Sequence, residues 1–239
     1  MSSAKPPVLA VRDLVVVRGG VPVVRRVTLE VGTSEVMAIV GPNGSGKTSM
    51  LEAVSGVVKA SGGSVALHGS DITRASRRRR SRLGLGHVRQ GRAVFSDLSV
   101  EENLRVAARD TDPAYEMFPE LRARSGTPAR ELSGGEQQML VLARTLIARP
   151  SCLLIDEISL GLAPTVVRRL TGAVKEAARA GAAVLLVEQY TSVALDVADV
   201  VSVLVRGETV LSERADVLRE DPRELQRAYM GAAADAAGK

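Results

Sequence analysis

Hydrophobic residues gather along the chain in two kinds of run, which predict strands and helices. Short runs rich in Val, Leu and Ile, bounded by Gly, Pro or charged residues, predict strands. They lie at residues 8–17, 23–31, 35–40, 64–67, 84–88, 151–155, 182–187, 200–205 and 208–211. Runs with apolar residues three or four positions apart predict helices. These lie at residues 46–55, 99–108, 113–121, 136–148, 164–180, 192–197 and 212–231, and residues 70–83 form a basic helix or a loop.

The order of these elements predicts one α/β domain that takes up the whole chain of 239 residues. Strands that alternate with helices favour a mixed core sheet, mainly parallel and covered on both faces. The first two strands flank Arg18-Gly-Gly20 and predict a hairpin in an antiparallel edge sheet. Residues 91–150 interrupt the alternation, which predicts an inserted helical subdomain between core segments 8–90 and 151–230.

Composition limits the classes of function. Aromatic residues make up only 2% of the chain, with no Trp, which argues against base stacking on aromatic side chains as the main activity. The net charge of +5 suits nucleotide phosphates, nucleic acid or an anionic membrane surface, and does not choose among them. The single cysteine, Cys152, excludes an internal disulfide and a cysteine-cluster metal site, and its apolar neighbours predict a buried thiol.

Neither an export signal nor a membrane span is predicted. Residues 1–7 are polar and Pro-rich, without the apolar centre of a signal peptide. No stretch approaches about 18 consecutive apolar residues. If the chain serves transport, the pore therefore belongs to another chain. The Ala- and Gly-rich end, residues 231–239, is expected to be a disordered tail.

A glycine-rich segment, Gly41-Pro-Asn-Gly-Ser-Gly-Lys-Thr48, matches the phosphate-loop pattern G-x-x-x-x-G-K-[ST] between a predicted strand and a predicted helix. Glycines let backbone N–H groups point at phosphate oxygens, and the helix start adds its positive end. We expect Lys47 to reach the β- and γ-phosphates of ATP as a catalytic residue, and Thr48 to offer its hydroxyl to Mg²⁺. The expected nucleotide-binding residues here are Gly41, Pro42, Asn43, Gly44, Ser45, Gly46, Lys47, Thr48 and Ser49.

Two acidic residues, Asp156 and Glu157, follow the apolar run Leu-Leu-Ile. A buried strand places them at the carboxyl edge of the sheet, where ligands bind in open α/β sheets. Asp156 is then expected to hold Mg²⁺, and Glu157 to activate or orient the attacking water. Alone, the pair would indicate two solvated acids at the end of a strand. The phosphate loop in the same chain favours the catalytic interpretation.

A second anion-binding helix start is predicted at residues 132–136, which read Leu-Ser-Gly-Gly-Glu. Ser133, Gly134, Gly135 and Glu136 precede or open a helix, so a hydroxyl and free backbone amides gather at its positive end. Alone, this segment would indicate an ordinary helix N-cap. Beside a phosphate loop, it is explained most simply as part of a nucleotide site on another subunit.

The order of these motifs resembles that of the ABC transporter ATPases: the phosphate loop, Gln90, the Leu-Ser-Gly-Gly-Glu segment and then Asp156-Glu157. The resemblance covers residues 8–228 and implies a P-loop NTPase fold of the ABC type, ATP and Mg²⁺ as cofactors, and Gln90 near the metal. It also implies a dimer in which Ser133 to Glu136 of each subunit close on the ATP bound by the other. The wording at residues 136–140, 159–164 and 187–189 is similar to that of branched-chain amino-acid importer ATPases.

The resemblance implies partners as well: membrane-spanning permease subunits, a second identical or related ATPase subunit and, indirectly, a solute-binding protein. It places the chain at the cytoplasmic face of the cell membrane, with nucleic acid not expected as a partner. Two alternatives stay open, a soluble ABC-type ATPase acting on nucleic acid or ribosomes and an ATP-binding regulator with little turnover. A single phosphate loop and the absence of sustained heptads disfavour the first of these.

Besides a family aspartate that is replaced around Leu162, as it also is in the branched-chain subfamily, three positions depart from the pattern of the family. Gln189 occupies the slot of a histidine that contacts the γ-phosphate; it can donate a hydrogen bond but does not titrate near neutral pH. Arg18 falls where an aromatic residue stacks on adenine, and a guanidinium either stacks on the base or is a solvated turn residue. Ile158 replaces a proline after Glu157. The departures predict slower hydrolysis rather than lost binding.

Arginines are densest at residues 77–80 and 82. A solvated face of a basic helix is one interpretation. Contact with anionic lipid headgroups below a membrane partner is the other, because each basic residue near such a surface contributes about 1 kcal/mol.

Overall fold

Six strands form the central sheet of the computed structural model, which describes residues 6–91 and 93–237, with side chains up to residue 229. The strand order is β10-β9-β3-β8-β7-β6, and all neighbours are parallel except β9 and β10. The strands are β3 (Val36–Val40), β6 (Leu85–Val88), β7 (Cys152–Asp156), β8 (Ala183–Glu188), β9 (Val200–Val205) and β10 (Glu208–Arg214). Every residue of β3, β7 and β8 is buried, as expected for strands covered on both faces. The predicted mainly parallel sheet is confirmed.

A second sheet of four antiparallel strands lies apart from the first, in the order β2-β1-β4-β5. Its strands are β1 (Leu9–Arg18), β2 (Val21–Val31), β4 (Gly62–Leu67) and β5 (Ser70–Asp71). The hairpin predicted around the Arg18-Gly-Gly turn is confirmed, because β1 and β2 pair from Leu9 with Val31 to Arg18 with Val21. The predicted antiparallel edge sheet is thus a separate layer.

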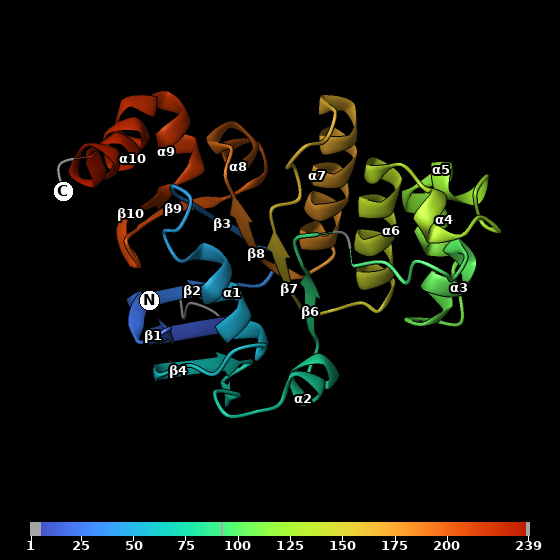
Figure 1. Cartoon of the computed structure of the whole chain (residues 1–239), viewed down its shortest axis with the longest axis horizontal. Helices are drawn as coiled ribbons and strands as arrows, with labels where there is room; N and C mark the ends of the chain where they lie inside the picture. Colours follow the sequence, from blue (N-terminus) through green and yellow to red (C-terminus); the bar gives the residue numbers. More distant parts are fainter. Residues whose placement is uncertain (1–5, 92, 238–239) are drawn as a thin grey trace.

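Helices cover the two faces of the central sheet unequally (Figure 1). Helix α1 (Lys47–Ser55) packs with the antiparallel sheet on one face, where Met50 and Leu51 join Cys152 and Leu154 in one buried cluster. Leu153, from the same strand, faces a larger cluster that receives most other helices. Those helices are α3 (Val100–Arg105), α4 (Asp112–Met117), α5 (Pro119–Arg122), α6 (Gly134–Ile147), α7 (Pro164–Arg179), α8 (Thr191–Val197), α9 (Ala215–Glu220) and α10 (Pro222–Ala237).

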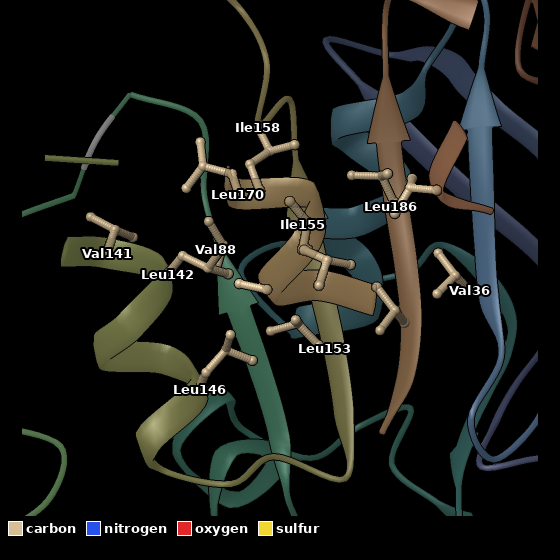
Figure 2. Packing of buried hydrophobic residues seen from close by; sticks show 14 of the residues in the cluster. Val36, Val88, Val141, Leu142, Leu146, Leu153, Ile155, Ile158, Leu170 and Leu186 are labelled. Carbon is tan, nitrogen blue, oxygen red and sulfur yellow. The ribbon is translucent and has the colours of Figure 1, made fainter. Parts of the chain in front are cut away.

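The helices between β6 and β7 share the larger cluster with the sheet. Leu142 and Leu146 of α6 lie against Leu153 and Ile155 of β7 in Figure 2. The same cluster continues to Phe118, which is fully buried between α4 and α5. The predicted division into a core and a helical subdomain stays a prediction, since the apolar packing runs through both parts without a break.

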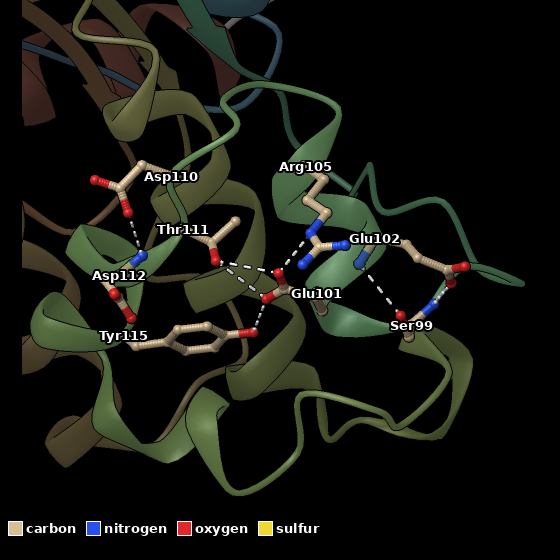
Figure 3. A network of polar contacts seen from close by, with 8 residues as sticks. All are labelled: Ser99, Glu101, Glu102, Arg105, Asp110, Thr111, Asp112 and Tyr115. Carbon is tan, nitrogen blue, oxygen red and sulfur yellow. Dashed lines mark hydrogen bonds and ion pairs between the residues drawn. The ribbon is translucent and has the colours of Figure 1, made fainter.

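Polar contacts hold the small helices α3 and α4 together (Figure 3). The Glu101 carboxylate accepts hydrogen bonds from the Tyr115 hydroxyl at 2.6 Å and from Arg105 Nε at 2.7 Å. Ser99 and Glu102 form a capping box at the start of α3, in which each side chain accepts from the other's backbone N–H. Helices of six residues are too short to be stable alone, so these contacts supplement the apolar packing.

Prolines divide two stretches that the sequence predicts as continuous helices. The stretch at residues 113–121 is split at Phe118, which has φ −132° and ψ 81° before Pro119. The stretch at residues 212–231 contains the end of β10, then α9, and a new start at Pro222. A residue before proline is pushed out of the helical region, and proline itself has no N–H to donate. Helix α10 continues to Ala237, so the predicted disordered tail is wrong for residues 231–237, and residues 238–239 lie outside the described part.

The basic run forms the short helix α2 (Arg77–Arg82), in which Arg80 alone is buried. Its guanidinium donates to the carbonyls of Ala53 and Val54 at 2.8 and 2.5 Å, and to those of Thr73 and Ala75 at 2.8 and 3.1 Å. Ala53 and Val54 belong to the last turn of α1, where carbonyls lack the usual intrahelical donor; Ala53 O also accepts from the N–H of the C-cap residue Gly56 at 3.2 Å. Arg80 therefore caps the helix that starts at the phosphate loop, and the cation lies at its negative end.

Replacing Arg80 by alanine is expected to lower the free energy of unfolding by about 2–4 kcal/mol, because buried carbonyls lose their charged donor. Urea denaturation followed by circular dichroism measures the change. The exposed neighbour Arg82 provides the matched control, and Arg82→Ala is expected to stay within about 0.5 kcal/mol of wild type. Equal losses in both variants would contradict the capping role.

Candidate nucleotide site

The phosphate loop joins β3 to α1, and its first and last glycines are sterically required. A Cβ atom on Gly41 would lie 2.1 Å from the carbonyl oxygen of Leu204. A Cβ on Gly46 would lie 2.2 Å from that of Val23, and Gly46 has a φ of 105°. Both distances are far below van der Waals contact. The loop therefore packs closely against the backbones of β2 and β9, and this packing requires glycine at both positions.

Lys47 and Ser45 fit a phosphate ligand. Lys47 is 5% exposed, and its Nζ donates to the carbonyls of Gly41 and Pro42 at 2.8 and 3.0 Å. Burial lowers the pKa of Lys47, while the nearby Glu157 and Asp156 act in the opposite direction. The buried Ser45 hydroxyl has no hydrogen-bond partner among the residues that the structure describes. Phosphate oxygens, as strong acceptors, match both donors.

Thr48 and Asp156 meet where α1 begins and β7 ends. Thr48 Oγ1 lies 3.2 Å from Asp156 Oδ1, and Asp156 is 3% exposed. Burial, together with Glu157 and Glu52, raises the pKa of Asp156 to about 6, against the pull of Thr48 and Lys47. A hydroxyl and a carboxylate are oxygen ligands of the kind that Mg²⁺ takes from P-loop proteins. The pair therefore fits the metal predicted for it.

Glu157 follows directly in the chain and pairs with Gln90. Gln90 Nε2 donates to Glu157 Oε2 at 2.6 Å. A cavity of about 430 Å³ opens beside this pair, and it is lined in part by Gln138 of α6. The side-chain nitrogen of Gln138 is buried and has no partner within the described part of the chain. Sequence reasoning placed Gln90 with the metal, and the structure brings its amide nitrogen to the predicted catalytic acid.

The three departures from the family pattern have different surroundings. Arg18 forms an ion pair with Glu52 of α1, so its guanidinium lies beside the phosphate-loop helix; the stacking interaction stays a prediction. Ile158 is buried in the larger cluster, and its packing there holds the turn that carries Glu157. Gln189 follows β8 at the same sheet edge and is partly exposed.

The second predicted anion site does not join the first within one chain. Ser133 accepts a hydrogen bond from Glu136 N at 3.3 Å, and Ser133 N donates to Glu136 Oε2 at 2.7 Å, which forms a capping box at the start of α6. Helix α6 packs in the larger cluster, whereas α1 packs on the opposite face of the sheet. No hydrogen bond among the described residues links Ser133 or Glu136 to the phosphate loop.

Sequence reasoning missed one pair at this edge, Glu188 and Ser159. Ser159 Oγ donates to Glu188 Oε2 at 2.6 Å, and Ser159 N donates to Oε1 at 3.2 Å. Glu188 is 1% exposed, and burial raises the pKa of its carboxyl group. The available signal was an acidic residue at the end of a strand that is apolar throughout, Ala-Val-Leu-Leu-Val.

A second cavity, of about 510 Å³, lies at the other end of the strands, between α2 and α6. Its lining includes Arg77, His87 and Arg144 and, among the residues that the structure describes, no carboxylate. Both ring nitrogens of His87 are buried without a partner there, and burial lowers its pKa to about 4. Phe95 and Val106 expose apolar surface at 47% and 59% around it. We call this hollow the basic groove.

Comparison with known proteins agrees with the geometry. The family model described as ABC transporter matches residues 24–159. A high-affinity branched-chain amino acid transport ATP-binding protein, BraG of Pseudomonas aeruginosa, is 35% identical over 89% of this chain and 95% of its own length. A probable branched-chain amino acid transport ATP-binding protein, LivF of Archaeoglobus fulgidus, is 35% identical over 86% of this chain and 91% of its own length.

The fold also has solved counterparts. The structure of an ATP-binding subunit of an ABC transporter matches with a TM-score of 0.82 and 23% identity, over 95% of this chain and 99% of that one. In the described part of this chain, no helix is long and apolar enough to cross a membrane. Sequence, fold and site point the same way: the chain belongs to the ABC transporter family, as an ATP-binding and ATP-hydrolysing subunit.

Proposed function

We propose that this subunit energises the import of branched-chain or other amino acids, using an ATP site at the edge where β3 and β7 end. The observation that carries the site is the convergence there of Lys47, the Thr48–Asp156 pair and the Gln90–Glu157 pair. The class of solute follows the similar proteins BraG and LivF, which are branched-chain amino acid transport ATP-binding proteins. In this proposal the solute itself is selected by the permease and the solute-binding protein.

Binding of ATP falls to the phosphate loop. Lys47 and the Ser45 hydroxyl donate to phosphate oxygens, and Arg18 stacks on the base after it leaves Glu52. Thr48 and Asp156 hold Mg²⁺, which neutralises charge on the phosphates when bound. Gln90 donates to Glu157 through its nitrogen, so its side-chain oxygen would remain available as a ligand for the metal.

Hydrolysis falls to Glu157 and Gln189. Glu157 orients the attacking water or takes its proton, and Gln90 holds the carboxylate in place by the 2.6 Å hydrogen bond. Gln189 donates a hydrogen bond to the γ-phosphate from the end of β8. An amide gives a weaker bond than a protonated histidine, so turnover is slow but less dependent on pH near neutrality.

A second copy or a related subunit completes each site. Because α1 and α6 lie on opposite faces of the sheet, the segment Ser133 to Glu136 serves the ATP bound by a partner. Two chains related by a two-fold axis bury both sites at once. ATP then favours the closed pair and hydrolysis releases it.

The basic groove is the docking surface for a membrane-spanning permease, which places the subunit at the cytoplasmic face of the membrane. The groove lies at the amino ends of β6 and β7, away from the ATP site at their carboxyl ends. Arg77, Arg144 and a rim of exposed apolar side chains suit an acidic, partly apolar segment of that partner. A solute-binding protein contributes indirectly, through the permease.

Glu157→Gln is expected to lower kcat for ATP at least about 100-fold, because the water loses its base, while ATP binding persists. Phosphate release by the purified full chain with Mg²⁺, alone and with its membrane partners, measures turnover. The exposed acid Glu220 gives the control Glu220→Gln, which should match wild type. Absence of turnover in wild type under both conditions, or normal turnover in Glu157→Gln, would refute the catalytic site.

Asp156→Asn is expected to stabilise the nucleotide-free chain by about 2–3 kcal/mol at pH 7.5. The folded pKa of Asp156 is raised to about 6 from an ordinary 3.8, so the folded state binds its proton more tightly than the unfolded state does. Stability is therefore lost as the pH rises through this window, and asparagine avoids the loss. Urea denaturation should show the full gain at pH 7.5 and only about 1 kcal/mol of it at pH 4.5. A gain that is equal at both pH values would contradict the assignment.

Arg77→Glu is expected to reduce co-purification with the permease by about fivefold, since a like charge would face the acidic segment. Co-expression with membrane-spanning permease subunits of an importer supplies the partner for this test. Arg227→Glu, an equal change of charge on exposed α10, is the control and should leave co-purification unchanged. Equal recovery with both variants would exclude the basic groove as the docking surface.

A further inference from the structure

The turn that carries Glu157 has a backbone conformation that needs external support. Glu157 has a φ of 52°, in the left-handed region that residues with a Cβ atom disfavour. Such a conformation persists only where surrounding contacts determine it. Its position, directly after β7 and at the predicted catalytic acid, makes those contacts relevant to the direction in which the carboxylate points.

Three contacts support this turn. Glu157 N donates to the carbonyl of Val187 at 3.0 Å, and the Ile158 side chain is buried in the larger cluster. The third contact is bidentate: Ser159 gives both its N–H and its hydroxyl to the two oxygens of Glu188. The first two contacts fix the start of the turn. The third fixes its far end, only two residues beyond Glu157.

Glu188 is placed to link the two halves of the site. It is the last residue of β8 and pairs in register with Val40, the residue before the phosphate loop. On the other side of β8, Val187 pairs with Asp156, the residue before Glu157. The backbone of Glu188 is thus fixed by the strand that leads to the phosphate loop, and its side chain holds the turn that follows β7.

Burial of an ionisable side chain such as Glu188 lowers the stability of the folded chain. Glu188 is 1% exposed, and its carboxylate accepts from the uncharged donors of Ser159. A buried charge costs several kcal/mol of desolvation, and an apolar or neutral side chain would satisfy the packing at lower cost. A role in orienting the turn accounts for an ionisable group here, because a carboxylate accepts two hydrogen bonds at once in a fixed geometry.

We propose that Glu188 is a positioning residue for ATP hydrolysis: with Ser159 it holds the left-handed turn at Glu157 and so sets the orientation of the catalytic carboxylate. The inference rests on the proposed role of Glu157. Glu188 acts through the turn and not on the nucleotide, so its removal affects turnover rather than ATP binding. A misplaced catalytic group costs rate because the reacting atoms no longer align.

Steady-state kinetics of the full chain test the proposal. Glu188→Ala is expected to lower kcat by about tenfold or more while the KM for ATP stays within about twofold. Glu188→Gln, which keeps the shape and one acceptor, should retain more activity than Glu188→Ala. Ser159→Ala should also lower kcat, and combining it with Glu188→Ala should add little. Ser202→Ala, which removes another buried serine hydroxyl bonded at 2.8 Å to Ser212, is the matched control and should match wild type.

Hydrogen exchange separates positioning from general instability. In Glu188→Ala the backbone amides of residues 157–162 should exchange faster while those of α7 and β3 keep their protection. Normal kcat in Glu188→Ala, a loss of kcat with a matching rise in KM, or faster exchange over the whole chain would each overturn the proposal. Glu157→Gln, measured in the same assay, separates failure of the proposed role of Glu157 from failure of the proposed role of Glu188. If it retains turnover, the role of Glu157 fails; if it is inactive while Glu188→Ala is fully active, only the positioning role fails.

Discussion

Parallel pairing of β3, β8 and β7 is the constraint on which the site depends. The three strands come from distant parts of the sequence, and parallel register brings all their carboxyl ends to one edge. Each strand is buried along its full length between two apolar clusters, so a slip by one residue would exchange the side chains packed in one cluster with those packed in the other. The phosphate loop, Asp156 and Glu188 therefore meet with a geometry that the apolar core enforces.

Charge at this edge works against the stability that the core provides. Lys47, Asp156 and Glu188 are nearly inaccessible to solvent. Burial lowers the pKa of Lys47 and raises those of Asp156 and Glu188, which in each case favours the uncharged form. An incoming nucleotide and its metal bring the opposite charges to the first two of these groups. The buried charges at this edge are thus poorly compensated in the empty chain and better compensated when nucleotide and metal are bound, as expected of a functional site that costs stability.

Much of this organisation was predictable because its signals are local. The Gly-rich loop, the acids after an apolar strand and the apolar pattern of each single element are each contained in a few neighbouring residues. Contacts between distant segments were not predictable in this way: the Gln90–Glu157 bond spans 67 residues, and Ser159 and Glu188 are 29 apart. A run of arginines indicates a solvated helix, and only packing against the end of α1 shows that Arg80 is buried. Prolines at helix starts were visible, but the apolar periodicity on both sides concealed the breaks.

The single cysteine has a practical consequence for this subunit. Cys152 is fully buried at the start of β7, and burial raises the pKa of its thiol to about 12. Thiolate is the form that reacts with alkylating reagents, so Cys152 does not react with them in the folded chain. A cysteine introduced at any exposed surface is then the sole labelled site, without removal of the native residue. The chain is in this respect already prepared for spin labels, fluorophores and cross-linkers that follow the opening and closing of its assembly.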